Sequence, residues 1–437
     1  MSDFWNGLSV QTQDIAIAAL LMVPLFVTGL ALLRGYRPMP LVAALIWRYR
    51  WANGMFTLLI AVSAGMGIGL IAQERGLRVG MAQAADKFDL VVSAPGSELT
   101  MMLAAVYLQA SNVPLLDGET YAALANHERV EIAAPIAFGD SYKGAPVVGT
   151  IADFVTHLAD GALDGRMWQN SAEAVIGAAV PLKVGDVFTP AHGMGGDADN
   201  AAHAGFEITV VGRMPRTGSP WDRALLVPVE TVWEVHGLAN GHALEDGDRI
   251  GPPFRSDLFP GTPAVIVKPL SLAAAYALRS EFNRDRETMA FFPGSVLSDL
   301  YRVMGDVRQA MSLMSLVTQG LVAASVLLGL FILSRLFQRQ LAMLRALGAP
   351  ARFVMAVVWL YGVGLLAAGT ALGLGLGLVA ARLLSWLVTQ RTDILVKATL
   401  GWSEMHLALG FLACTSLLVL LPAYAVLRRS LVDTLRG

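Results

Sequence analysis

The chain has 437 residues, of which 55% are hydrophobic and 15% charged, and its mean hydropathy is +0.56. This apolar content exceeds that of soluble globular proteins, so the composition predicts an integral membrane protein. The formal net charge of −2 provides no basic surface for a row of phosphates, which argues against nucleic acid as a partner. The single cysteine, Cys414, excludes an intrachain disulfide.

The first apolar run, Ile15 to Leu33, covers about 19 residues, roughly the 30 Å thickness of the hydrocarbon layer. No basic residue precedes it, so we expect a retained N-terminal transmembrane helix within 1–34 rather than a signal peptide. The segment 35–54 mixes apolar residues with arginines and tryptophans, which predicts a cytoplasmic amphipathic helix in the membrane interface. Continuation of a spanning helix is the alternative for this segment.

Four further apolar runs and a polar middle stretch complete the chain. The predicted parts are a span at 55–72, an outer domain at 73–310, a span at 311–333, a cytoplasmic coupling helix at 334–352, a span at 353–382, an outer loop at 383–405, a span at 406–427 and a cytoplasmic tail at 428–437. Within the outer domain, short β-rich stretches alternate with helical patterns, which predicts an α+β fold. The predicted fold class is therefore a membrane α-helical bundle of five spans with an α+β extracytoplasmic domain.

Arginines decide the predicted orientation, because cytoplasmic loops carry an excess of basic residues. Three clusters occupy alternate loops of the five-span arrangement: Arg34, Arg37, Arg48 and Arg50; Arg335, Arg339, Arg345 and Arg352; and Arg428, Arg429 and Arg436. All three fall on one side, which we assign to the cytoplasm. The N-terminus and the middle domain are then expected outside.

The fourth predicted span contains the pattern Gly369-x-x-x-Gly373-x-x-x-Gly377. Small residues at this spacing allow helix backbones to approach closely in lipid. The stripe predicts either a dimer interface or close packing within one chain.

The segment between the third and fourth spans has the pattern of a short amphipathic helix, with leucines at 336, 341, 344 and 347 among arginines. Gly348 followed by Pro350 is typical of a helix end. Such a helix can place apolar residues in a groove of a partner protein. An interfacial helix on anionic lipid is the alternative.

Two cytoplasmic motifs carry a family resemblance. The segment Arg335-Leu-Phe-Gln-Arg-Gln-Leu-Ala-Met-Leu-Arg-Ala-Leu-Gly-Ala-Pro and the C-terminal Leu427-Arg-Arg-Ser-Leu-Val-Asp-Thr-Leu-Arg-Gly are similar to segments of ABC permeases of the MacB/FtsX/LolC family. In the outer domain, the run from Gly165-Arg166 through Val175-Ile-Gly177 and Gly185-Asp186 to Gly212 is similar to the MacB-type periplasmic core domain. The chain departs from the family in its extra N-terminal span and in Gln340, where many members have Glu.

The resemblance implies a multi-pass permease of the bacterial inner membrane with its large domain in the periplasm. It implies a second permease copy, with a homodimer favoured, and a separate ATPase subunit that binds ATP and Mg²⁺. The residues it assigns to ATPase coupling are Arg335, Arg339, Leu341, Leu344, Arg345, Leu347 and Gly348. The expected cargo is hydrophobic, a peptide or a lipoprotein. The alternatives are a regulator that activates a periplasmic partner and a metal-responsive transporter.

The sequence contains no G-x-x-x-x-G-K-[ST] segment and no G-x-S-x-G elbow. We therefore expect no enzymatic activity in this chain, and ATP hydrolysis by another polypeptide.

Four histidines of the middle domain stand near acidic residues: His192, His203, His236 and His242. Imidazole and carboxylate ligands together suit zinc, so these residues form a predicted metal site. Their spacing matches no standard zinc motif, and a solvated acidic loop is the alternative.

A turn-rich loop contains Trp221, Asp222 and Arg223. These three residues are a predicted periplasmic binding site, because loops on a rigid scaffold often carry recognition. A structural turn tied by Asp222 is the alternative, and the one that we favour.

Overall fold

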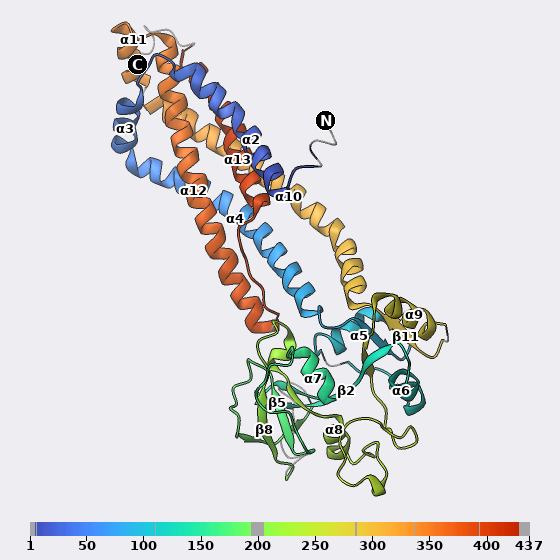
Figure 1. The fold of residues 1–437 in the computed structure, drawn as a ribbon. Helices are drawn as coiled ribbons and strands as arrows, with labels where there is room; N and C mark the ends of the chain where they lie inside the picture. The colour runs from blue at the N-terminus through green and yellow to red at the C-terminus, as the bar shows by residue number, and fades with distance from the viewer. Residues whose placement is uncertain are drawn as a thin grey trace. The chain divides into compact units, whose positions relative to one another are not determined.

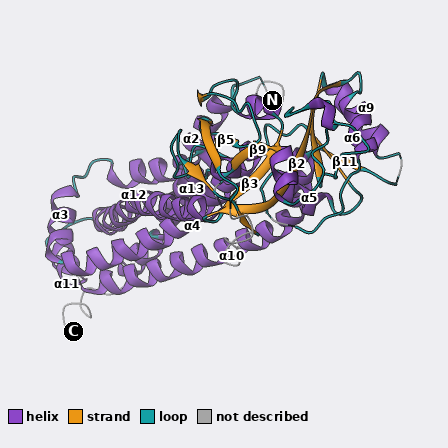
Figure 2. Cartoon of the chain, turned by 90° about the horizontal axis from the view of Figure 1, so that it is seen from below, coloured by secondary structure: helices purple, strands orange, loops and turns teal. Residues whose placement is uncertain are grey.

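The structure is a computed structural model that describes residues 5, 7–109, 111–193, 205–284, 286–336, 338–392 and 394–427. It divides into two compact units (Figure 1). One, here the helical unit, comprises Met1–Leu77, Asp306–Leu387 and Lys397–Gly437. The other, the sheet unit, comprises Arg78–Gly305 and Val388–Val396, and the described strands are confined to it (Figure 2).

The helical unit is formed by eight described helices, three of which continue into the sheet unit. They are α2 (Val10–Leu33), α3 (Met39–Arg48), α4 (Arg50–Ala84), α10 (Pro293–Leu336), α11 (Gln338–Ala346), α12 (Ala351–Thr392), α13 (Trp402–Leu418) and α14 (Leu420–Leu427). Ser9 begins α2, because its hydroxyl accepts a hydrogen bond from the backbone N–H of Thr12 at 3.3 Å.

Four of the described helical segments are long and apolar enough to cross a membrane: Val10–Leu33, Arg50–Ala84, Ala351–Thr392 and Trp402–Ala425. The remaining predicted span, 311–333, lies within α10 and is helical. Its crossing of a membrane stays a prediction. Both α4 and α12 continue beyond the apolar runs that predicted them, α12 by ten residues past position 382.

The glycine stripe of α12 packs against α4 within the chain. A Cβ added at Gly373 would lie 2.8 Å from the Cβ of Ala64, and one added at Gly377 would lie 2.6 Å from the carbonyl oxygen of Gly65. The backbones of the two helices approach so closely because both present small residues. The stripe is therefore used for close packing within one chain, one of its two predicted roles.

Contacts within the helical unit bring arginines around α11 beside the ends of α2 and α14. Arg352, at the start of α12, donates a hydrogen bond to the carbonyl of Ala31 near the end of α2. Arg345 donates to the carbonyl of Leu427 at the end of α14, with 3.4 Å between Nη1 and the oxygen. In Figure 1 the helices α3 and α11 lie at the same end of this unit. The C-terminal cluster at 428, 429 and 436 is outside the described residues.

The sheet unit contains a mixed sheet with the strand order β11-β1-β10-β2-β3-β9-β5-β8-β4, to which β6 is added at β8 and β7 at β2. The strands are β1 (Leu90–Ser93), β2 (Val130–Tyr142), β3 (Ala145–Thr150), β4 (Asp164–Gly165), β5 (Glu173–Ile176), β6 (Val187–Phe188), β7 (Ala191–His192), β8 (Ile208–Arg213), β9 (Leu225–Pro228), β10 (Ala264–Pro269) and β11 (Met289–Phe291). Most pairs are antiparallel, whereas β3 with β9 and β5 with β8 are parallel.

Five short helices accompany this sheet: α5 (Glu98–Ala105), α6 (Gly118–Ala125), α7 (Ala152–Leu158), α8 (Val229–Val235) and α9 (Leu272–Phe282). Two 3₁₀ turns, Pro220–Arg223 and Leu244–Asp246, complete the described elements. Strands and helices alternate irregularly, so the predicted α+β character of this unit is confirmed.

Candidate functional site

The predicted coupling residues lie at the end of α10 and in or directly after α11: Arg335, Arg339, Leu341, Leu344, Arg345, Leu347 and Gly348. One side of α11 faces the core of the helical unit, where Leu341 is buried and Leu344 is partly buried. The other side is open, since Arg339 is exposed and the side chains of Met343 and Leu347 are 49% and 86% exposed. The helix is thus amphipathic, as its sequence predicts, and it also exposes apolar side chains on the surface of the helical unit.

The end of α11 is fixed by its glycine. Gly348 has φ of +93°, in the left-handed region that favours a residue without Cβ. This turn lets the N–H of Ala349 donate to the carbonyl of Leu344 at 2.9 Å, which satisfies a carbonyl at the helix end. The predicted glycine cap is confirmed, and Leu347 is held beside it as an exposed side chain.

In the predicted binding loop, Trp221 is completely buried. Its indole Nε1 donates to the carbonyl of Val106 at 3.1 Å, and its ring lies 5.5 Å from that of Phe154 in an edge-to-face contact. The expectation that this side chain is available for recognition is therefore wrong. Arg223, two positions further on, is partly buried.

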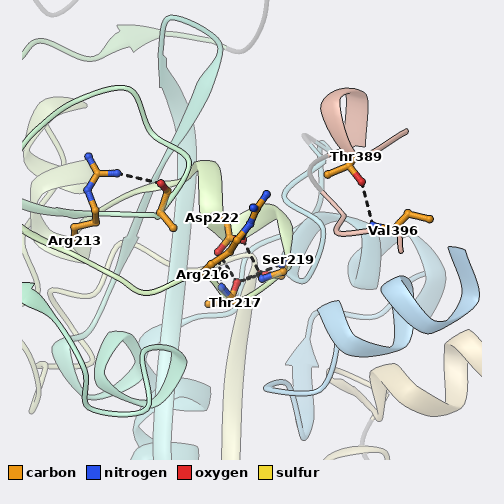
Figure 3. A network of polar contacts seen from close by, with 9 residues as sticks. Arg213, Arg216, Thr217, Ser219, Asp222, Thr389 and Val396 are labelled. Atoms are coloured by element: carbon orange, nitrogen blue, oxygen red, sulfur yellow. Dashed lines mark hydrogen bonds and ion pairs between the residues drawn. The ribbon is translucent and has the colours of Figure 1, made fainter. Parts of the chain in front are cut away.

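Asp222 holds the same loop together, as Figure 3 shows. Its buried carboxylate accepts hydrogen bonds from the backbone N–H of Thr217 at 2.7 Å and of Gly218 at 2.9 Å. Arg216 contributes a weaker contact, with 3.8 Å between its Nε and the carboxylate. The loop is thus the structural turn tied by Asp222 that the sequence favours.

This loop also contacts the segment that follows α12, which belongs to the sheet unit. The N–H of Leu395 donates to the carbonyl of Gly218 at 3.1 Å. The N–H of Val396 donates to the hydroxyl of Thr389 at 3.0 Å, which closes the turn after the helix (Figure 3). Within this unit the loop therefore anchors the segment that follows α12.

Two of the predicted metal ligands, His192 and His236, come together around a carboxylate that the sequence did not indicate, that of Asp140. Asp140 lies in β2 opposite His192 of β7, directly after an irregularity between Phe138 and Asp140 in the pairing of β2 with β3. Such bulges redirect side chains near functional sites. The glycine directly before Asp140, inside a long strand, is the sequence signal that could have pointed to the bulge.

The three side chains have different surroundings. The side chain of Asp140 is 2% exposed, that of His236 is 25% exposed and that of His192 is 54% exposed. His236 follows α8 as its C-cap residue, and its Nδ1 donates to the carbonyl of Val232 at 2.7 Å. The hydrogen bond with Asp140 raises the pKa of His236 above its usual value, against the opposing effect of burial.

The other two predicted ligands are not part of this cluster. His242 is buried, and its Nε2 lies 3.3 Å from Oε1 of Glu230. Burial raises the pKa of the Glu230 carboxyl. His203 lies outside the described residues.

No protein-family model and no curated protein sequence matches the chain. Among solved structures, the chain is similar to the periplasmic region of MacB from Actinobacillus actinomycetemcomitans, with 12% identity and a TM-score of 0.29 over 50% of this chain and 95% of that one. It is also similar to the extracellular domain of the noncanonic ABC-type transporter YknZ from Gram-positive bacteria, with 13% identity and a TM-score of 0.27 over 46% of this chain and 98% of that one. These scores are too low to assign the chain to a family.

Proposed function

We propose that this protein is the permease subunit of an ABC transporter, with a large domain outside the membrane and a separate ATPase subunit bound at α11. The observation that carries the proposal is the exposed side of α11, where Met343 and Leu347 present apolar surface beside Arg339. Exposed apolar side chains next to a positive charge suit a groove on a protein partner with acidic residues at its edge. The motifs that resemble ABC permeases include this same helix.

The proposed orientation puts α11 in the cytoplasm, where ATP is available. It is supported by the contacts of Arg345 and Arg352, which gather arginine-bearing segments at one end of the helical unit. At that end, the indoles of Trp47 and Trp51 are 73% and 80% exposed, as expected of side chains in the membrane interface.

Helix α12 supplies a route for motion in this proposal. It begins directly after the turn at Gly348 and continues without interruption to Thr392, where the segment fixed by the Asp222 loop follows. A single helix can carry a displacement because its backbone hydrogen bonds keep its length constant. ATP-driven movement of α11 would thus reach the sheet unit and drive export or extraction of a hydrophobic, peptide or lipoprotein cargo. A second copy of the chain completes the proposed transporter.

The test is purification of the tagged full chain from its own cells in mild detergent, followed by identification of an ABC ATPase that co-purifies with it. We expect a stable complex whose ATP hydrolysis requires both chains. Leu347→Asp should lower ATPase binding about tenfold or more, because a charge at a central apolar contact removes most of that contact's energy. The matched control is Leu244→Asp, the same substitution at a fully exposed leucine of the sheet unit.

If Leu347→Asp binds the ATPase as the wild type does, or if Leu244→Asp weakens binding equally, the proposal that α11 binds the ATPase is wrong. Absence of a complex with wild-type protein would reject the transporter proposal itself.

A further inference from the structure

Three side chains with metal-binding atoms meet in the sheet unit although they come from separate elements: Asp140 of β2, His192 of β7 and His236 after α8. We propose that they bind a divalent transition ion, and specifically zinc. This proposal does not rest on the transporter function, because the ligands lie within one unit and act without an ATPase.

The spacing of the three atoms is that of a tetrahedral zinc site. Nδ1 of His192 lies 3.2 Å from Nε2 of His236, and Oδ1 of Asp140 lies 3.4 Å from each of these nitrogens. Zinc binds nitrogen and carboxylate oxygen at about 2.0–2.2 Å, so two ligands at the tetrahedral angle stand roughly 3.3–3.6 Å apart. The three atoms therefore already form one face of such a tetrahedron, and only small shifts are needed to admit the ion.

Hydrogen bonding prepares His236 as a ligand. The carbonyl of Val232 can only accept, so Nδ1 of His236 carries a hydrogen, and in the neutral ring the lone pair is on Nε2. Without the ion, Nε2 donates its hydrogen to the carboxylate of Asp140, and zinc binding would displace this proton and take the lone pair. A ligand histidine whose second nitrogen donates to a carbonyl is the common arrangement at zinc sites, because this bond fixes the ring and raises its basicity.

Charge and access also favour the ion. The carboxylate of Asp140 is almost completely buried, and a divalent cation would neutralise it more fully than hydrogen bonds alone. More than half of the His192 side chain is exposed, so the site is open to ions from solvent. Three protein ligands leave a fourth position for water or a further ligand, and two imidazoles select zinc over magnesium or calcium.

The local structure supports this geometry in the absence of the ion. Gly193 donates its N–H to the carbonyl of Gly139 at 2.8 Å, and the hydroxyl of Ser141 donates to the carbonyl of Gly193 at 2.7 Å. These bonds fix β7 beside β2 and keep Asp140 and His192 as cross-strand neighbours, whose Cβ atoms stand about 5 Å apart in an antiparallel pair.

The experiment uses the full chain in detergent, stripped with a chelator and then titrated with zinc chloride alone. We expect about one tightly bound zinc ion per chain, measured by equilibrium dialysis and elemental analysis. X-ray absorption at the zinc edge should show two imidazole ligands. Asp140→Asn, His192→Gln and His236→Gln should each lower zinc affinity by at least about 100-fold, the upper end of what loss of a mere supporting residue costs.

The matched control is His127→Gln, which removes a histidine of the same unit that pairs with Glu281 at 3.4 Å. It should bind zinc as the wild type does. Circular dichroism and size exclusion identify any variant that fails to fold. In that case the X-ray absorption spectrum of the wild type shows, without variants, whether two imidazoles bind the zinc ion.

The proposal is overturned if the wild type binds no zinc, or if its spectrum lacks two imidazoles. It is equally overturned if the three ligand variants keep wild-type affinity, since the ion would then be held elsewhere. Transport or ATPase binding enters none of these readouts, so failure here leaves the permease proposal intact, and the converse also holds.

Discussion

The contact between α4 and α12 predicts a sharp difference between two substitutions on one helix. Gly377→Ala places a methyl group 2.6 Å from the backbone carbonyl oxygen of Gly65, well inside an ordinary van der Waals separation. Gly375→Ala, two positions earlier, places the same methyl group in open space, with nothing within 4 Å. Both changes replace a helical glycine with alanine, so their effect on helix propensity is the same and cancels in the comparison.

The expected magnitude follows from what must move. The atom facing Gly377 is backbone, so no side chain can rotate away and the helices themselves must separate by several tenths of an ångström. Overpacking of this kind costs about 1–3 kcal/mol. Gly377→Ala should therefore be less stable than Gly375→Ala by about 1–3 kcal/mol, while Gly375→Ala should equal or exceed the wild type.

The assay is unfolding of the detergent-solubilised chain by increasing mole fraction of sodium dodecyl sulfate, followed by tryptophan fluorescence and circular dichroism. Equal stability of the two variants would refute the intramolecular packing of the stripe. A loss of stability in both that depends on protein concentration would instead indicate a contact between copies of the chain.

Two further predictions concern the sheet unit. Glu230→Gln should flatten the pH dependence of stability. Burial raises the pKa of the Glu230 carboxyl even beside His242, so its neutral form contributes stability at low pH that is lost as pH rises through the folded-state pKa. Thermal melts from pH 4 upward should therefore show the Tm of the wild type falling relative to that of the variant. A Tm difference between wild type and variant that stays constant over that pH range would contradict this prediction. Asp222→Ala should destabilise the unit by about 2–4 kcal/mol, because two backbone N–H groups lose their acceptor. Arg216→Ala should cost under about 1 kcal/mol, because the Arg216 side chain is 62% exposed and its Nε lies 3.8 Å from the carboxylate. Chemical unfolding measures both free energies. Similar losses in these two variants would argue against Asp222 as the tie of the loop.

Features that depend on near neighbours in the chain were predictable. The turn at Gly348 and the two-sided character of α11 follow from residues three to five positions apart, so the sequence pattern contains all the information needed. Apolar runs predicted the long helices for the same reason, although α4 and α12 continue past those runs because a helix does not have to end where its apolar residues do.

Features that depend on distant partners were not predictable from spacing. Trp221 has the local context of an exposed turn, and only the fold puts Val106 and Phe154 around it. Asp140 is a single carboxylate in a strand, and its relation to His192 arises from pairing between strands 52 positions apart. The four histidines were grouped because they stand near acidic residues, and their spacing follows no zinc motif. Spacing alone therefore could not separate His242 from His192 and His236, which come together in the fold.

The strand β7 explains why a metal ion would matter at this place in the sheet. It has two residues, pairs with β2 alone among the described strands, and brings His192 to the cluster by only a few hydrogen bonds. The other two ligands stand on better-anchored elements, since β2 pairs on both sides and α8 packs against the sheet. An ion bound by all three ligands would therefore stabilise mainly β7, the least anchored of the three elements.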